Sequence, residues 1–130
     1  MGLLDGFKVI DAVTGVPSVS ITKNGIAFNK TVVEKMGCPS YVCAMIDKEN
    51  KRFAIVPCEK DAKGHRAFYK KGRSTSYGVR WNNADLRMTI EMLMDWNLEE
   101  SSWKVVGTYY EEENVLMFDL KEAEMMDKRQ

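Results

Sequence analysis

The side chains able to perform chemistry are few, and they form no recognised catalytic or metal-binding motif. The chain has 130 residues, with three cysteines at positions 38, 43 and 58 and a single histidine, His65. A zinc site needs paired ligands at regular spacing, which these cysteines lack. We therefore expect free, mostly buried thiols and neither a metal nor a cofactor. Cys58 and His65 are separated in sequence without a motif that joins them, so we expect no enzyme.

A second kind of chemistry lies in residues 60–80, where cations alternate with aromatic side chains. The basic residues there are Lys60, Lys63, Arg66, Lys70, Lys71, Arg73 and Arg80, and the aromatic ones include Phe68, Tyr69 and Tyr77. Cations bind phosphates and aromatic rings stack on bases, so the segment suits a nucleic acid. A solvated linker explains the same composition, and the chain as a whole is neutral, with 19 basic and 19 acidic residues. Both interpretations stay open.

From residue 91 onward the chain is mostly acidic, which makes the molecule two-sided in charge. Such a pattern suits head-to-tail association, or a DNA-binding face opposite a protein-binding face. The run Glu111 to Glu113 is contiguous rather than spaced like a calcium loop, so we expect a solvated turn there.

These residues must be positioned by elements that the chain repeats. Gly25 to Asn29 and Gly78 to Asn82 share the pattern glycine, aliphatic, variable, aromatic, asparagine. Each asparagine is expected to cap a helix. The expected helices cover 31–36 and 84–96, and the expected strands after them cover 41–46, 52–57, 103–110 and 115–120. Val19 and Ile21 predict a leading strand, and Asn24-Gly25 predicts the hairpin turn that follows it.

The fold class that these patterns predict is α+β. Two pseudo-repeated β-α-β-β units, about residues 18–62 and 78–123, are joined by a basic linker, 63–77. Together they form one compact, mostly antiparallel β domain, 1–130, with two helices. Phe7 to Val13 predicts a further peripheral strand or an arm that pairs with another chain.

The second expected helix has two apolar stripes, Leu86, Ile90 and Leu93 in one and Met88, Met92 and Trp96 in the other. We expect both to lie mostly in the core, the alternative being a methionine-rich surface that binds a partner. The first residues do not read as a signal peptide, and no apolar run is long enough to span a membrane. The expected location is the cytoplasm.

The order of elements from Ile21-Thr22-Lys23-Asn24-Gly25 to Val56-Pro57 resembles the AbrB/MraZ-type swapped-hairpin transcription factors. Lys23, Gly25, Lys30, Glu34, Lys35, Met36-Gly37 and Pro57 fall where that pattern has them. Members of the MraZ type carry two such units in one chain. Where the family usually carries arginine, this chain has Ile26 and Val33, and Asn29 replaces the proline before the helix. The resemblance implies a swapped-hairpin fold and binding to DNA.

Two functions follow from this pattern. The first is a nucleic-acid-binding transcriptional regulator, whose expected phosphate and base contacts are Lys23, Lys30, Lys35, Lys63, Arg66, Lys70, Lys71, Arg73 and Arg80. Arg73 and Arg80 are the expected base readers, because only arginine offers a bidentate fork. The alternative is a non-enzymatic protein-interaction or oligomerisation module, either a homo-oligomer or part of a larger assembly.

Overall fold

A computed structural model describes residue 3 and residues 15–70 and 78–126. The strands are β1 (Ser18–Thr22), β2 (Gly25–Phe28), β3 (Tyr41–Asp47), β4 (Arg52–Pro57), β5 (His65–Ala67), β6 (Val79–Trp81), β7 (Ser102–Tyr110), β8 (Val115–Asp119) and β9 (Glu124–Met126). The helices are α1 (Lys30–Lys35), α2 (Ala84–Met94) and the short 3-10 helix η2 (Leu120–Glu122). The expected mixture of helices and antiparallel strands is confirmed, as an α+β fold.

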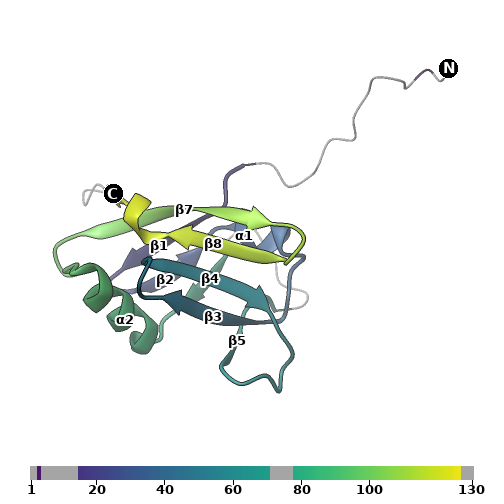
Figure 1. Ribbon diagram of the computed structural model, residues 1–130, viewed down its shortest axis with the longest axis horizontal. Helices are drawn as coiled ribbons and strands as arrows, with labels where there is room; N and C mark the ends of the chain where they lie inside the picture. Colours follow the sequence, from purple (N-terminus) through teal and green to yellow (C-terminus); the bar gives the residue numbers. More distant parts are fainter. Residues whose placement is uncertain (1–2, 4–14, 71–77, 127–130) are drawn as a thin grey trace.

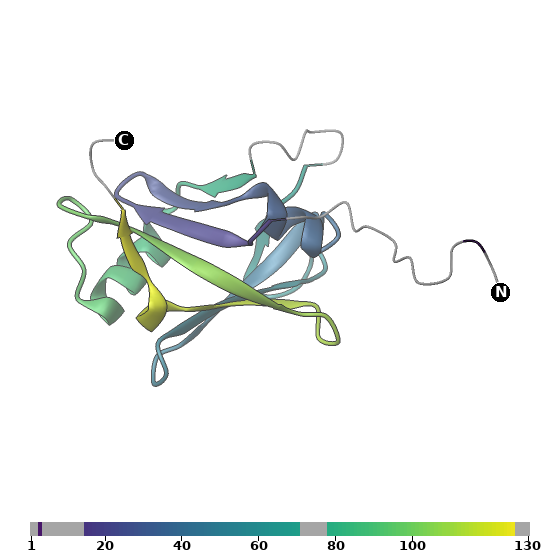
Figure 2. The same cartoon turned by 90° about the horizontal axis from the view of Figure 1, so that it is seen from above.

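All strand pairs are antiparallel, and the order across the sheet is β5-β3-β4-β8-β7-β1-β2-β6, with β9 paired to β7. The sheet curls into a half-barrel, and α1 and α2 lie at opposite ends of it (Figures 1 and 2). Hence β5 and β6 are the two outer strands of the curled sheet. Each of them is three residues long.

The strand pairing has a regularity that the sheet order makes visible. If β1 to β4 are exchanged with β5 to β8, every pairing in that order maps onto another observed pairing, with one exception. The exception is the β1–β2 hairpin, whose counterpart would be a β5–β6 pair. The opening of the half-barrel is therefore the place of that one missing pair.

The core fills the inside of the curled sheet. Phe28 of β2 lies at its centre, with ring centroids 6.1 Å from Phe53, 5.5 Å from Phe68, 4.9 Å from Trp81 and 6.1 Å from Phe118. Phe28, Phe53 and Phe118 are at most 1% exposed. Because these rings come from both halves of the chain, the two halves share one core.

The first helix has the predicted cap, whereas the second begins at the predicted residue, Ala84, without the predicted cap. The side chain of Asn29 accepts a hydrogen bond from the Val32 N–H at 3.1 Å and so caps α1. For α2 the cap residue is Asn83 rather than Asn82, and its side chain makes no capping bond. The helix ends at Met94 because Asp95 adopts a left-handed conformation with φ 57°.

Two other expectations, for the first hairpin turn and for the linker, are wrong, and a third concerns residues that the structure does not describe. The β1–β2 turn is Lys23-Asn24, between the paired residues Thr22 and Gly25, so the loop lies one residue earlier than predicted. Strand β5 lies inside the segment expected to be a linker, and β9 was not predicted. The expected strand Phe7 to Val13 lies outside the described residues.

Candidate functional site

A groove of about 1170 Å³ opens between β5 and β6. Its walls are β5, β6, the residues that flank them and the start of α2. It therefore occupies the place of the missing strand pair.

The strand register turns main-chain groups into this groove. Phe68 N–H donates to Ser40 O at 2.8 Å, so the alternation of an antiparallel ladder directs the Ala67 N–H and C=O away from β3. On the other wall, the Asn29 N–H donates to Ser18 O and so fixes which residues of β2 bond to β1. When the alternation is continued across β2 to β6, the main-chain groups of Arg80 point away from β2. The two strands thus face the groove with hydrogen-bonding edges.

Trp81 closes the bottom of the groove from inside. Its indole Nε1 donates to Ala67 O at 2.9 Å, which links β6 to β5 through a side chain. Trp81 and Phe68 are only 6% and 7% exposed, so they form a floor and are not available for stacking. Three further rings line the groove, the exposed His65 and the half-buried Tyr41 and Tyr69.

Arg66 lies across this floor. Its guanidinium carbon is 5.4 Å from the centre of the Trp81 ring, and its Nη2 is 3.0 Å from Oδ2 of Asp85. The hydrogen bond from Arg66 is the main cause of a lowered pKa of Asp85, and the Leu86 N–H adds to it. Asp85 is the only acidic residue that lines the groove among the described residues.

Of the predicted site residues, Arg66, Lys70 and Arg80 line the groove. Lys63 directly precedes Gly64, which also lines it. Lys71 and Arg73 lie outside the described residues.

The other predicted cations lie on the first half of the chain. A Cβ on Gly25 would lie 2.3 Å from Trp81 O, and one on Gly78 would lie 3.1 Å from the Asn29 Cα. Lys23 and Lys30 therefore lie near the two ends of β6, in the β1–β2 turn and at the start of α1. Lys35 is in the last turn of α1 and does not line the groove.

Sequence reasoning missed Asp85 as a groove residue and assigned Trp81 only to the core. It also placed Met88 and Met92 mostly in the core, but they are 53% and 83% exposed. The four-residue spacing of Met88 and Met92 indicates a shared stripe on α2, and spacing alone does not tell which stripe faces inward.

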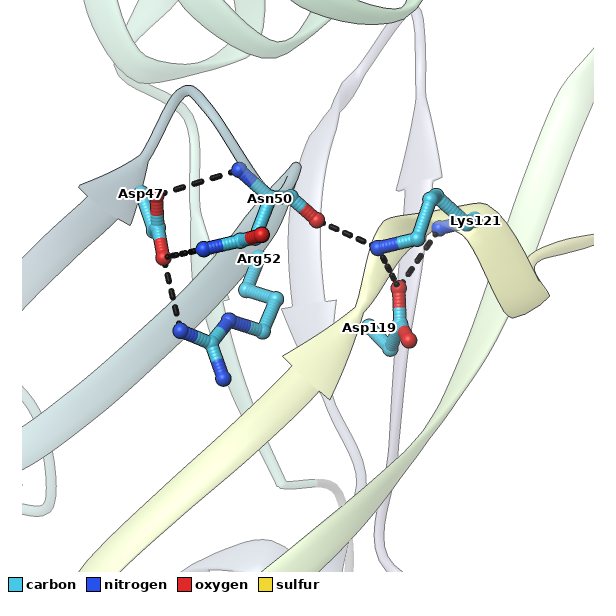
Figure 3. A network of polar contacts seen from close by, with 5 residues as sticks. All are labelled: Asp47, Asn50, Arg52, Asp119 and Lys121. Atoms are coloured by element: carbon cyan, nitrogen blue, oxygen red, sulfur yellow. Dashed lines mark hydrogen bonds and ion pairs between the residues drawn. The ribbon is translucent and has the colours of Figure 1, made fainter.

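A separate polar network joins the β3–β4 turn to the end of β8 (Figure 3). Asp47 accepts from Asn50 at 2.9 Å and from Arg52 at 2.7 Å, while Lys121 contacts Asp119 at 3.0 Å and donates to Asn50 O. Hydrogen bonds from Asn50 first, and then from Arg52, hold the pKa of Asp47 well below its usual range. Every carboxylate is engaged by a neighbour, so the network fastens a turn rather than forming a site.

His65 Nδ1 lies 3.0 Å from Ala62 O, and its ring meets Tyr41 edge-on at 5.4 Å. Within the described ranges there is no group of three or more His, Cys, Asp or Glu residues able to hold a metal ion. In the same part of the chain, no helix combines the length and apolar character needed to cross a membrane.

Comparisons of the chain with protein-family models, curated proteins and solved structures gave no significant match.

Proposed function

We propose that this protein binds nucleic acid through the β5–β6 groove and acts as a transcriptional regulator. The observation that carries this proposal is the convergence of Arg66, Lys70 and Arg80 on one groove that contains a single described acid. Cations gathered in a groove raise the local concentration of a polyanion even when the whole chain is neutral.

The groove also has groups that suit bases. Tyr41 and Tyr69 line the groove and are half-buried, and aromatic side chains along a basic groove suit stacking with bases. Arg80 is exposed and can present its guanidinium fork to a base edge. Lys23 and Lys30, near the two ends of β6, lengthen the basic path beyond the groove.

The test is fluorescence anisotropy with a labelled random duplex and a labelled single strand, each titrated with salt. Binding should weaken linearly on a logarithmic plot, and its slope counts the phosphate contacts. Arg80→Ala should lower the affinity and reduce the slope by about one. Lys48→Ala, in the β3–β4 turn at the far end of β3, is the matched control and should change neither. Absence of binding at low salt would refute the proposal.

A protein-interaction module is the second candidate, because Met88 and Met92 are exposed on α2. Exposed methionines suit adaptable protein contacts. If this surface makes a homo-oligomer, sedimentation should show an assembly that Met92→Lys dissociates and Arg80→Ala leaves intact. A monomer at high concentration would exclude the homo-oligomer.

We further propose that the chain arose by internal duplication and is related to the AbrB/MraZ-type factors. What supports this is the exchange regularity of the sheet, together with the strand–helix–strand–strand order in both halves. The β1–β2 hairpin also pairs with β7 of the other half, as a swapped hairpin would.

A further inference from the structure

The outer face of the sheet, which points away from the core, carries large apolar side chains on β3 and β7. In β7, Val105 is 0% exposed and points into the core, so the alternation of a strand places Val106 and Tyr110 on the outer face. They are 52% and 45% exposed. In β3, Val42 is 0% exposed, and Met45 lies on the outer face with 47% exposure.

The strand register joins these side chains across four strands. Met45 of β3 is opposite Ala54 of β4, Ala54 is opposite Met117 of β8, and Met117 is opposite Thr108 of β7. Directly opposite residues of antiparallel strands have Cβ atoms about 4.5–5.5 Å apart, so the four form one continuous row. A second row, two residues further along each strand, consists of Cys43, Val56, Val115 and Tyr110. All members of the two rows except Thr108 are apolar.

The helices do not cover this face. Both α1 and α2 lie at the ends of the half-barrel rather than over β3, β4, β8 and β7 (Figures 1 and 2). A sheet face that meets water normally carries polar residues. A contiguous apolar patch across several strands instead marks a surface that binds another protein.

The two ends of this face carry opposite net charge. The β7–β8 turn lies at one end and the β3–β4 turn at the other (Figure 1). Residues 111–114 hold three exposed glutamates and no cation, a net charge of −3. Residues 48–51 hold the exposed Lys48 and Lys51 against Glu49, a net charge of +1. Beside the second turn lie two ion pairs whose charges cancel, Asp47–Arg52 and Asp119–Lys121.

We propose that a second copy of this chain covers the face, so that two outer faces pack against each other in a twofold dimer. A twofold axis across the strands reverses their direction, which brings each β7–β8 turn onto the β3–β4 turn of the other copy. The opposite charges of the two turns favour this orientation, and the apolar rows are buried between the sheets, about 10 Å apart. The face includes neither β5 nor β6, so this inference is independent of nucleic-acid binding in the groove.

The first test is sedimentation equilibrium of the full chain over a range of concentrations. The wild type should form a dimer, and Met45→Lys should weaken it roughly thirtyfold or more, because a charge would be buried between the sheets. Met92→Lys, which changes an exposed methionine of α2, is the matched control and should dimerise as the wild type does. Circular dichroism should show that both variants are folded. A monomeric wild type would leave the face to another partner and overturn the proposal, and so would a dimer that Met92→Lys dissociates and Met45→Lys does not.

A charge exchange between the turns tests the orientation with surface substitutions alone. Lys48→Glu with Lys51→Glu gives the β3–β4 turn a net charge of −3, and Glu111→Lys with Glu113→Lys gives the β7–β8 turn a net charge of +1. Each double variant alone should dimerise roughly tenfold more weakly, because turns of like charge then meet. An equimolar mixture of the two should regain the wild-type strength, since both contacts of the mixed dimer again pair opposite charges. Wild-type dimerisation of each variant alone, or a mixture as weak as its components, would overturn the proposed arrangement.

Discussion

Replacing Gly25 should reveal how closely β6 is pressed against β2. Gly25 has φ +135°, and a Cβ there would lie 2.3 Å from Trp81 O. Gly37 has φ +81° with nothing within 4 Å of such a Cβ, so Gly37→Ala measures the backbone cost alone. That cost is about 1–2 kcal/mol. Gly25→Ala carries at least that cost, because φ +135° lies outside the left-handed helical region that alanine can adopt, and it also forces Trp81 O away.

The additional cost follows from the contacts of Trp81. Moving β6 breaks the ladder where Trp81 pairs with Ile26, at about 1 kcal/mol for each hydrogen bond lost. It also disturbs the edge-on contact of Trp81 with Phe28, worth about 1 kcal/mol. Two hydrogen bonds and this contact bring the expected loss for Gly25→Ala to roughly 3–5 kcal/mol. Gly25→Val should cost more, because a β-branched residue resists positive φ.

Urea and thermal unfolding of the wild type, Gly37→Ala and Gly25→Ala provide the assay. At roughly 3–5 °C for each kcal/mol in a chain of this size, Gly25→Ala should melt about 10–20 °C below the wild type. Gly37→Ala should melt only about 4–8 °C below it. If the two variants lie within about 1 kcal/mol of each other, the close approach of β6 is wrong.

Three further outcomes are expected. Asp85→Asn should tighten nucleic-acid binding and raise the salt slope by about one, because it releases Arg66 from its ion pair; anisotropy that matches the wild type would mean that Arg66 contacts no phosphate. Asn29→Ala should cost at least about 1–2 kcal/mol in thermal unfolding, since the cap bond to Val32 and the side-chain bonds to Val16 and Ser18 are lost, and an unchanged melting temperature would contradict the capping role. Asp47 has a lowered pKa in the folded chain, so its stabilisation is present above the unfolded-state pKa of about 3.9 and is lost as pH falls. Lowering the pH from 5 to 2.5 should therefore lower the melting temperature of the wild type more than that of Asp47→Asn. Equal decreases would refute a stabilising role of the Asp47 carboxylate.

Much of the fold can be predicted from the sequence because apolar and less apolar residues alternate along its strands. Val19 and Ile21, and then Ile26 and Phe28, alternate with less apolar residues, and these four are at most 1% exposed. Strand β5 escaped prediction because His65-Arg66-Ala67 has no such alternation. This segment forms a strand because it pairs with β3 and because Phe68, which directly follows it, is buried in the core.

The groove is harder to predict from the sequence because its two walls belong to different halves of the chain. Arg66 and Arg80 were predicted as nucleic-acid contacts from the local composition, and both line one groove in the structure. The acid that pairs with Arg66 could not be found in this way, because Asp85 lies on α2, 19 residues from Arg66 in the sequence. Local sequence determines the charges, whereas strand order determines which charges meet.

The strand order also explains why the barrel is open at this place, and Trp81→Phe tests the explanation. The β1–β2 hairpin closes through a two-residue turn, whereas β5 and β6 are joined by the longer stretch 68–78. Among the described residues, the Trp81 indole bonds across from β6 to Ala67 O. Phenylalanine keeps the ring in the core but removes the donor, which should cost about 1 kcal/mol locally. Exchange of the Phe68 amide, bonded to Ser40 O, should then become about fivefold faster. The Asn29 amide, bonded to Ser18 O in the β1–β2 hairpin, is the internal control and should keep its rate. Equal acceleration of both amides would mean that the indole bond supports the whole fold, and no change in either would mean that the β5–β6 opening does not depend on it.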